Sequence, residues 1–267
     1  MTTDLTGKYG PWGVVAGGSD GVGAAFAQVM AQSGMNVVLV ARRESVLDQV
    51  ASDIRASHGV EVRTIILDLS DPGAIAELEG ATSDLEVGLF VFNAGGGNHS
   101  IPFLEQDLDH HLGQVQRNCA SVLEAAHRFG APMVARGRGA LVLLSSTSAW
   151  VGGLTYASYS ATKSFDLILA EGLWAEWRDC GVDVLAPVLG LTDTPSMRRV
   201  VDAAVLEQVQ AADPYDVAVE VLDHLGDGPT WLLGSDDPEG GSPFGAMSRR
   251  DAVLTMAGMV TGSSDEE

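Results

Sequence analysis

The sequence predicts an α/β protein built on a doubly wound parallel sheet of seven strands, with helices on both faces. Short β-branched runs alternate with longer stretches of helical length and periodicity, and the short runs are apolar almost throughout. Near-continuous apolar strands are typical of a parallel sheet that is covered on both faces. The expected strands are 13–16, 36–40, 62–67, 88–92, 140–144, 182–186 and 230–233.

Helical segments fill the spaces between these strands. The clearest are Ala24 to Ser33, Glu44 to Ser57 and Ser160 to Asp179. The alternation breaks between Pro195 and Ala212, after the sixth strand, on the side where ligands bind in such sheets. Because no Pro- or Ser-rich linker and no repeat is visible, we expect a single domain. This catalytic domain covers 1–267, and we expect it to contain a substrate loop at about 190–212 and an acidic tail at about 235–267.

The composition restricts the classes of partner. The chain has 36 acidic and 15 basic residues, which gives a formal charge of −21. This charge argues against a nucleic-acid or anionic-membrane partner, because both need clustered basic residues. No apolar run reaches the roughly 18 residues that a membrane helix needs, and the N-terminus lacks the layout of a secretory signal. We therefore expect a cytoplasmic protein.

Cysteine and histidine patterns predict no metal site. Cys119 and Cys180 are the only cysteines, and their pattern suggests neither a metal site nor a disulfide framework. We expect both to be reduced. His99, His110 and His111 show no ligand spacing with nearby Cys, Asp or Glu, which favours surface or loop positions.

A glycine-rich turn follows the first strand directly and leads into the next helix. It reads Gly17-Gly18-Ser19-Asp20-Gly21-Val22-Gly23. Glycine lets the backbone approach a pyrophosphate, and the helix N-terminus supplies amides and a favourable dipole. Glycines also serve plain tight turns, but the place of these between strand and helix favours phosphate binding.

Tyr159 and Lys163 form a pair at helical spacing. The chain has only two lysines, and this one lies four residues after the tyrosine, so both side chains share one helix face. A nearby cation favours the phenolate and pulls a tyrosine pKa down from its reference of about 10, so that the phenol can exchange a proton at neutral pH. Ser146 lies thirteen residues upstream, where a strand would deliver its hydroxyl to the edge of the sheet.

Together with Phe92-Asn93-Ala94-Gly95 after the fourth strand and Asn118, these motifs resemble the short-chain dehydrogenase/reductase family. The resemblance runs from about Trp12 to Leu233. It implies a single Rossmann-like domain, a nicotinamide cofactor, and hydride exchange between a carbonyl and a secondary alcohol.

The resemblance also implies roles for individual residues. Tyr159 would be the general acid/base, and Ser146 would hold the substrate oxygen. Lys163 would bind the nicotinamide ribose and favour the Tyr159 phenolate. Asn118 would anchor a water that relays protons from Lys163 to solvent.

Each role has an alternative. Ser145 competes for the catalytic serine position, although the thirteen-residue offset favours Ser146. Tyr156 is a second phenol, but no lysine follows it at the fourth position, so we expect it in the wall of the substrate pocket. Asn118 would otherwise stabilise a bend in its helix, which is compatible with the relay.

The chain departs from the family pattern at two places. Ala16 and Phe92 replace polar residues that tie adjacent strands together in the family. Losing one would leave a buried polar group unpaired at a cost of about 1–3 kcal/mol, whereas losing both can be nearly neutral; we interpret the change as a coordinated repacking. After the sixth strand the family's Pro-Gly becomes Pro187-Val188, while Thr192 keeps the place of the threonine that contacts the nicotinamide.

The end of the second strand predicts NADP(H) rather than NAD(H). An acidic residue there would bind both ribose hydroxyls and repel a 2′-phosphate, but the position is Ala41. Arg42 follows with a planar head that suits a phosphate, and we expect Arg43 nearer the adenine. Asp20 counts slightly against this choice. The expected cofactor-binding residues are Gly17, Ser19, Asp20, Gly21, Val22, Arg42, Arg43, Asp68, Leu69, Asn93, Ala94, Gly95, Tyr159, Lys163, Pro187 and Thr192.

The leading hypothesis is an NADP(H)-dependent oxidoreductase for an apolar substrate of hydroxysteroid, 3-oxoacyl or aromatic ketone type. Residues 8–15 and the Ser19-Asp20-Gly21 turn are similar to a branch of the family that acts on hydroxysteroids and 3-oxoacyl thioesters. The alternative is a catalytically silent, NADP-binding scaffold or sensor, and the tyrosine–lysine pair disfavours a methyltransferase. Candidate residues of an apolar pocket are Pro195, Met197, Val200, Val201, Ala204, Val205, Met247, Met256 and Met259.

The resemblance further implies a homodimer or homotetramer, in which the helices that hold the active site pack across a two-fold axis. Trp174 and Trp177 are candidate interface aromatics on the helix after Tyr159. Internal packing is an equally good interpretation of both tryptophans.

Overall fold

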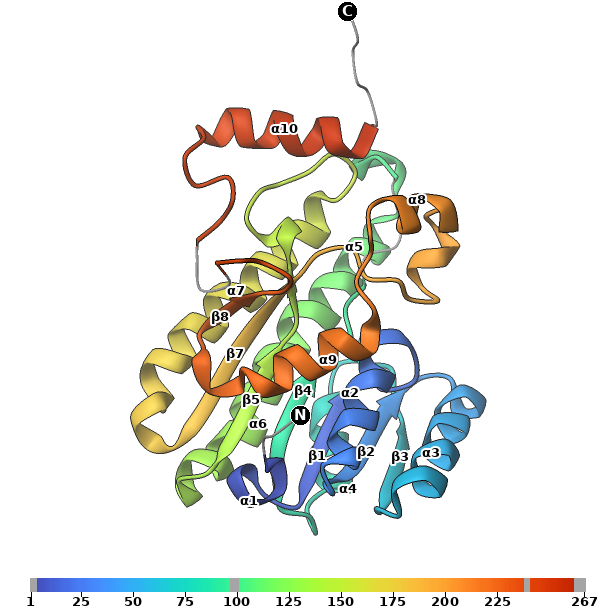
Figure 1. Cartoon of the computed structure of the whole chain (residues 1–267), viewed down its shortest axis with the longest axis vertical. Coiled ribbons are helices and arrows are strands. Elements are labelled where there is room, and N and C mark those ends of the chain that lie inside the picture. Colours follow the sequence, from blue (N-terminus) through green and yellow to red (C-terminus); the bar gives the residue numbers. More distant parts are fainter. Residues whose placement is uncertain (1–3, 97–100, 238–240, 262–267) are drawn as a thin grey trace, which may run out of the picture.

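The computed structural model describes residues 4–96, 101–237 and 241–261. A parallel sheet runs through the molecule with helices on both faces (Figure 1). The strand order is β3-β2-β1-β4-β5-β7-β6, and β8 pairs with β7. This order reverses at β1 and β4, as in a doubly wound sheet, and confirms the predicted fold class. The strands are β1 Trp12–Ala16, β2 Asn36–Ala41, β3 Val62–Ile66, β4 Val87–Phe92, β5 Gly139–Leu143, β6 Ser145–Ser146, β7 Val182–Leu189 and β8 Thr230–Leu232.

All seven expected strands are present, and the two-residue strand β6 is an addition. Gly139 of β5 pairs with Val182, and Ser145 of β6 pairs with Val188, so both strands face β7 in one register. Leu144 interrupts them, and its amide donates instead to the carbonyl of Phe92 at the end of β4. Strand β6 therefore extends β5 beyond the end of β4 and carries its serines to the C-terminal edge of the sheet.

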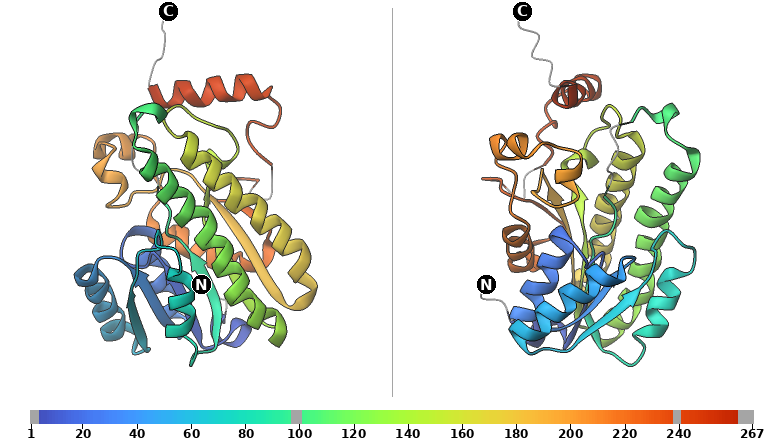
Figure 2. Two further views of the ribbon diagram at one scale, coloured as in Figure 1. Left: turned by 180° about the vertical axis from the view of Figure 1, so that it is seen from behind. Right: turned by 90° about the vertical axis from the view of Figure 1, so that its right-hand side faces the viewer.

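The helices divide between two faces (Figures 1 and 2). Helices α2, α3 and α9 pack with one apolar cluster of the sheet, and α4, α6 and α7 pack with the other. None of the helices in the described part of the chain is long and apolar enough to cross a membrane. The helices are α1 Leu5–Tyr9, α2 Gly21–Gln32, α3 Glu44–His58, α4 Ala74–Ala81, α5 Leu108–Val115, α6 Ser121–Arg136, α7 Ala157–Trp177, α8 Ala203–Gln208, α9 Pro214–Asp223 and α10 Arg249–Thr261.

The apolar pair Ala16 and Phe92 packs as a unit. The two residues lie opposite each other in the register of β1 and β4. Both are buried in the same apolar cluster. Both members of the pair are apolar, so neither leaves a polar group of the other unpaired, as a coordinated repacking requires.

The segment 249–261, expected to be part of an acidic tail, forms helix α10 and begins with Arg249 and Arg250. The Arg249 guanidinium donates to the carbonyl of Trp150 at 2.6 Å, and Ala252 is buried. The helix lies across the end of the molecule that also holds α8 (Figure 1). It therefore packs on the segment that connects β6 to α7.

Candidate active site

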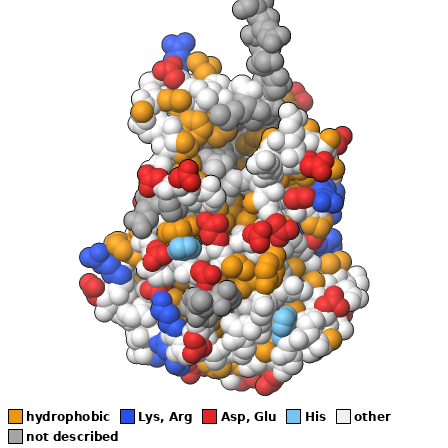
Figure 3. Space-filling view, in the orientation of Figure 1, with side chains coloured by type: hydrophobic (Ala, Val, Ile, Leu, Met, Phe, Trp, Pro, Cys, Tyr) orange, Lys and Arg blue, Asp and Glu red, His pale blue; other side chains and the backbone are white. Residues whose placement is uncertain are grey.

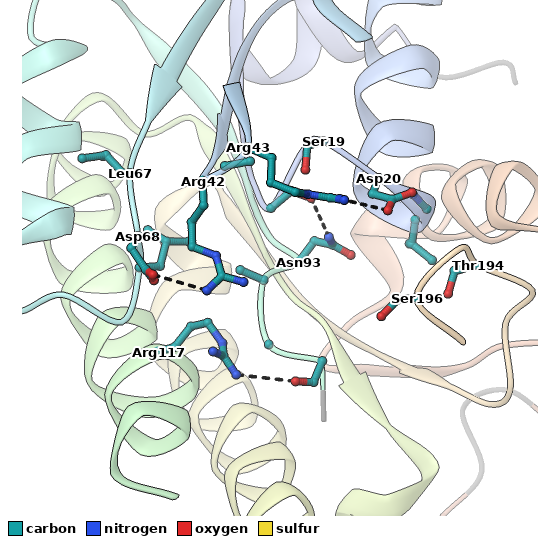
Figure 4. A pocket seen from close by; sticks show the side chains of 18 of the residues that line it. Ser19, Asp20, Arg42, Arg43, Leu67, Asp68, Asn93, Arg117, Thr194 and Ser196 are labelled. Carbon is teal, nitrogen blue, oxygen red and sulfur yellow. Dashed lines mark hydrogen bonds and ion pairs between the residues drawn. The ribbon is translucent and has the colours of Figure 1, made fainter. Parts of the chain in front are cut away.

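A cleft of about 620 Å³ opens at the C-terminal ends of the strands around the β1–β4 reversal (Figure 4). In doubly wound sheets this is the place where ligands bind. The lining residues are Gly17, Ser19, Asp20, Gly21, Val22, Ala41, Arg42, Arg43, Leu67, Asp68, Leu69, Asn93, Ala94, Gly95, Gly96, Arg117, Thr194, Ser196 and Arg199.

The glycine turn can be built only from glycine at its key positions. Gly17 has a φ of +89°, and a Cβ there would lie 2.8 Å from the amide nitrogen of Ala94. A Cβ on Gly23 would collide with the carbonyl oxygen of Gly17. The Asp20 carboxylate accepts a hydrogen bond from the amide of Gly21 at 2.9 Å and caps helix α2. The turn thus brings backbone and a helix N-terminus to the floor of the cleft, which suits a phosphate group.

Arginine and aspartate side chains alternate along one wall of the cleft. Arg42 pairs with Asp68 at 3.3 Å, and Arg43 pairs with Asp20 at 3.0 Å. Arg199 reaches Asp20 from the loop after β7, at 3.8 Å. Burial opposes ionisation of Asp68, but the Ser70 amide and the Arg42 guanidinium hold the pKa of Asp68 below its ordinary value.

Arg117 is a further cleft residue, and its nearest polar partners are neutral. Its guanidinium donates to Asn118 Oδ1 at 3.1 Å, to Ser70 Oγ at 3.4 Å and to the Gly96 carbonyl at 3.5 Å. Figure 4 labels Arg117 at the cleft and marks one of these contacts. Burial lowers the pKa of Arg117. Among the described residues no carboxylate lies within ion-pair distance of it, so its charge is directed at the cleft.

Asn118 and Lys163 meet at Gly95, where β4 leads into the cleft. Asn118 is fully buried and donates to the Gly95 carbonyl at 3.2 Å and to Thr162 Oγ1 at 3.0 Å. A Cβ on Gly95, at φ +139°, would lie 3.0 Å from Asn118 Oδ1 and 3.3 Å from Lys163 Nζ. Residues 116–120 form a π-helical turn between α5 and α6, a device that is frequent at functional sites. The turn swings Asn118 toward α7.

Burial distinguishes the two candidates for the catalytic serine, Ser145 and Ser146. The Ser145 hydroxyl is buried and donates to the carbonyl of Lys163 at 3.0 Å. Ser146 is half-buried and accepts a hydrogen bond from the amide of Ser148 at 3.3 Å. Ser145 thus ties β6 to α7, whereas Ser146 stays partly exposed.

Tyr159 lies one turn before Lys163 on α7, near enough for their charges to interact. Its ring stands at 61° to that of Tyr156, with ring centroids 6.4 Å apart. Both phenols are half-buried. The structure therefore places both tyrosines at the same end of the helix, with Lys163 one turn further along.

Lys163 has an ionic partner, Asp166, which none of the sequence motifs indicates. Its ammonium donates to the Leu144 carbonyl at 2.6 Å and to Asp166 Oδ2 at 3.0 Å. Both side chains of this ion pair are buried, with 5% and 3% exposed.

The structure brings most of the predicted cofactor residues to one place, and it adds others. Pro187 lies within β7, and the buried Thr192 bridges to Ala212; like Tyr159 and Lys163, these two residues are not part of the cleft lining. Their role as cofactor contacts stays a prediction. Met259, a predicted residue of the apolar pocket, and His99 lie outside the side chains that the structure describes. Ala41, which the sequence placed where an acidic residue would select NAD(H), also lines the cleft. Cleft residues that the sequence did not indicate are Leu67, Gly96, Arg117, Thr194, Ser196 and Arg199.

A doubly wound sheet with a phosphate-type turn and a tyrosine–lysine helix at its C-terminal edge defines a dinucleotide-dependent oxidoreductase. A model of the short chain dehydrogenase family matches residues 12–204. The chain belongs to this family, whose cofactor is NAD(P), and it is an oxidoreductase that acts on alcohol and carbonyl groups.

Known proteins similar to the chain agree with this class. A 7beta-hydroxysteroid dehydrogenase of Collinsella aerofaciens is 35% identical over 195 residues, which cover 73% of each chain. A solved structure on 7beta-hydroxysteroid dehydrogenase stereoselectivity superimposes with a TM-score of 0.88 at 29% identity, covering 95% of this chain and 99% of the other. A short-chain dehydrogenase from Sphingobium yanoikuyae in complex with NADPH gives a TM-score of 0.76 at 26% identity, covering 96% and 98%.

Proposed function

We propose that the chain interconverts a ketone and a secondary alcohol on an apolar substrate with NADP(H), and that Tyr159 is its general acid/base. The observation that carries this proposal is the junction at Gly95. This residue lines the cleft and also lies against Asn118 and Lys163. The site for the dinucleotide and the helix that bears Tyr159 are thereby joined.

The residues of the cleft fit a dinucleotide. Its glycine turn leaves no room for a Cβ at Gly23, and the α2 N-terminus offers unpaired amides for the pyrophosphate. Gly17, Ser19, Gly21, Val22, Asn93, Ala94 and Gly95 would hold the dinucleotide along this floor.

Four side chains would manage the reacting oxygen and its proton. When bound, the nicotinamide supplies or accepts the hydride. Ser146 would hold the substrate oxygen, and Tyr159 would give or take the proton there. Lys163 would favour the phenolate and bind the ribose. Asn118 would anchor the water of the proton relay.

The choice of NADP(H) rests on the arginines. Arg42 stands at the end of β2 beside Ala41, and Arg117 adds a second cation whose hydrogen bonds go to neutral groups. Asp20, which argued for NAD(H), is engaged by Arg43 and Arg199, so its charge is offset. Steady-state comparison of NADPH and NADH on any accepted substrate tests the choice. Equal or better efficiency with NADH would contradict it.

A steroid-like apolar substrate is supported by the similar proteins and by the segments around the catalytic end. Four exposed apolar side chains lie on these segments: Leu154 on the β6–α7 connection, Val200 on the loop after β7, Val205 on α8, and Met247 just before α10. Figure 3 shows apolar side chains gathered on this face below α10. Cofactor oxidation over hydroxysteroids and their ketones, 3-oxoacyl thioesters and aromatic ketones tests the class.

An assembly of two or four chains is also proposed. The tryptophans do not support the interface interpretation, because Trp174 and Trp177 pack against the core beneath α7. Exposed apolar side chains on α5, α6 and α7 are better candidates. They are Leu108, Leu112, Val115, Leu123 and Ile168.

The chain is further proposed to act as one catalytic domain in the cytoplasm. Both cysteines are unpaired thiols, Cys119 partly buried and Cys180 exposed, which suits a reducing compartment. Limited proteolysis that releases a stable internal fragment would contradict the single domain, and cell fractionation tests the compartment.

A further inference from the structure

The ion pair of Lys163 and Asp166 is a buried charge pair inside the catalytic helix. The two residues lie one turn apart on α7, with Nζ and Oδ2 3.0 Å apart. Asp166 Oδ1 has no hydrogen-bond partner in the described part of the chain. A buried carboxylate usually satisfies both oxygens. Here its single strong contact is with the lysine.

This carboxylate favours the charged form of Lys163. Burial by itself lowers the pKa of the lysine, but Asp166, together with Tyr159, offsets this effect and the pKa of Lys163 lies above its ordinary value. Burial likewise raises the pKa of Asp166, and Lys163 opposes that rise. Asp166 therefore favours the cationic form of Lys163 against the effect of burial.

The groups that face this pair come from three elements. Tyr159 lies on the same helix and interacts with Lys163. Arg117 and Cys119 face it from the π-helical turn, and burial, followed by Asp166, raises the pKa of Cys119 to about 11. From the β5–β6 junction comes the neutral Leu144 carbonyl. Asp166 is thus the anion next to a proton-exchanging tyrosine–lysine pair.

We propose that Asp166 is a positioning residue of the catalytic centre, which fixes the Lys163 ammonium against the Leu144 carbonyl and sets the pH at which the Tyr159–Lys163 pair releases its proton. This inference rests on the proposed role of that pair. Asp166 is not itself in the cleft lining and needs no contact with substrate or cofactor.

The sign of the effect follows from electrostatics. An anion stabilises the protonated forms of its neighbours, and its removal lowers the pKa of each group coupled to it. In the ketone-reducing direction, activity falls at high pH as the pair loses its proton. In Asp166→Asn, which keeps the shape and removes the charge, this fall should move to lower pH by about one unit or more.

The experiment measures pH–rate profiles in both directions for wild type, Asp166→Asn and Asp166→Glu. The alcohol-oxidising rise should move to lower pH in the Asn variant as well, and the Glu variant should return both profiles toward wild type. Glu171→Gln removes an exposed acid from the same helix and serves as the matched control. A lower kcat in Asp166→Asn with unmoved profiles would overturn the proposal.

A second measurement needs neither turnover nor cofactor. The phenolate absorbance of each protein is titrated, and the same titration of the Tyr159→Phe form is subtracted to isolate one of four tyrosines. The Tyr159 midpoint should lie at lower pH in Asp166→Asn; an unchanged midpoint overturns the inference. If the Asn variant does not fold, Asp166→Ser takes its place. An inactive wild type would refute the proposed function and leave this titration decisive for Asp166.

Discussion

At the scale of single residues, the candidate active site contains two kinds of group: buried residues that support the site, and half-buried hydroxyls that are proposed to react. Asn118, Ser145 and Lys163 are buried and hydrogen-bonded within the protein, whereas Ser146 and Tyr159 are half-buried. A buried, hydrogen-bonded group cannot easily change its orientation. The half-buried hydroxyls can therefore meet a substrate while their supports stay fixed.

Tyr159→Phe should lower kcat by about 10²–10⁴-fold, the usual contribution of a general acid/base. The ring and its packing remain, so cofactor affinity, measured by fluorescence titration, should stay nearly unchanged. Tyr215→Phe removes a hydroxyl that bonds Gln32 at the end of α2 and is the matched control. Turnover of the Tyr159 variant within a few-fold of wild type would exclude the assigned role.

Arg42 and Arg43 provide a paired test of cofactor choice. A hydrogen bond to a charged group contributes roughly 1.5–3 kcal/mol, so Arg42→Leu should reduce the NADPH/NADH ratio of kcat/KM by about 10–100-fold. Arg43→Leu should reduce it less, because Arg43 is expected nearer the adenine than the 2′-phosphate; both guanidiniums are paired with an aspartate, so the ion pairs alone do not separate them. Combining Ala41→Asp with Arg42→Leu should invert the preference. A larger effect from Arg43 than from Arg42 would reassign the phosphate contact.

At the scale of elements, the strands were predictable because their apolar runs end at polar or glycine residues. The continuation of β5 into β6 was not, since it depends on β7 extending past Pro187 to Leu189. Asp166 reads in the sequence as one more helical acid. Asp166 becomes buried only when α7 packs against β6. The position of Arg117 over the cleft likewise depends on the tertiary fold, because the π-helical turn that carries it is not visible in the sequence.

The turn before α2 and the interior of α7 predict opposite effects for two glycine substitutions. Gly23→Ala would drive a Cβ into the Gly17 carbonyl, so cofactor affinity and thermal stability should both fall. Gly172 lies within α7, and a Cβ added there would point into open space. Gly172→Ala should stabilise the protein by about 0.5–1 kcal/mol, as expected for Ala in a helix interior. Calorimetry and cofactor titration of both variants check this contrast, which fails if they behave alike.

At the scale of the whole molecule, a formal charge of −21 coexists with an anion-binding cleft. Four arginines, Arg42, Arg43, Arg117 and Arg199, line that one cleft. Against them stand two acidic residues, Asp20 and Asp68, so the cleft is net positive in formal charge although the chain as a whole is strongly negative. The excess of acidic residues and the role of Arg42 and Arg43 could be predicted from the sequence. Arg199 reaches the cleft only through the folding of the loop after β7.

The exposed apolar face of α5, α6 and α7 leads to a prediction about assembly. Helices α5 and α7 are in contact, and Leu112 and Ile168 on them are 56% and 63% exposed. If this face joins two copies of the chain, Leu112→Glu with Ile168→Glu would bury unpaired charges, which is strongly unfavourable. Light scattering should then show wild type as a dimer or tetramer and the double variant as the 27.9 kDa monomer.

Leu254→Glu, at a similarly exposed apolar position on α10, distinguishes this face from general surface stickiness. It should leave the mass of the assembly unchanged, because α10 packs over the β6–α7 connection. Dissociation by Leu254→Glu alone would move the interface to α10. A monomeric wild type at working concentration would instead mean that the apolar face on α5 and α7 does not join copies of the chain.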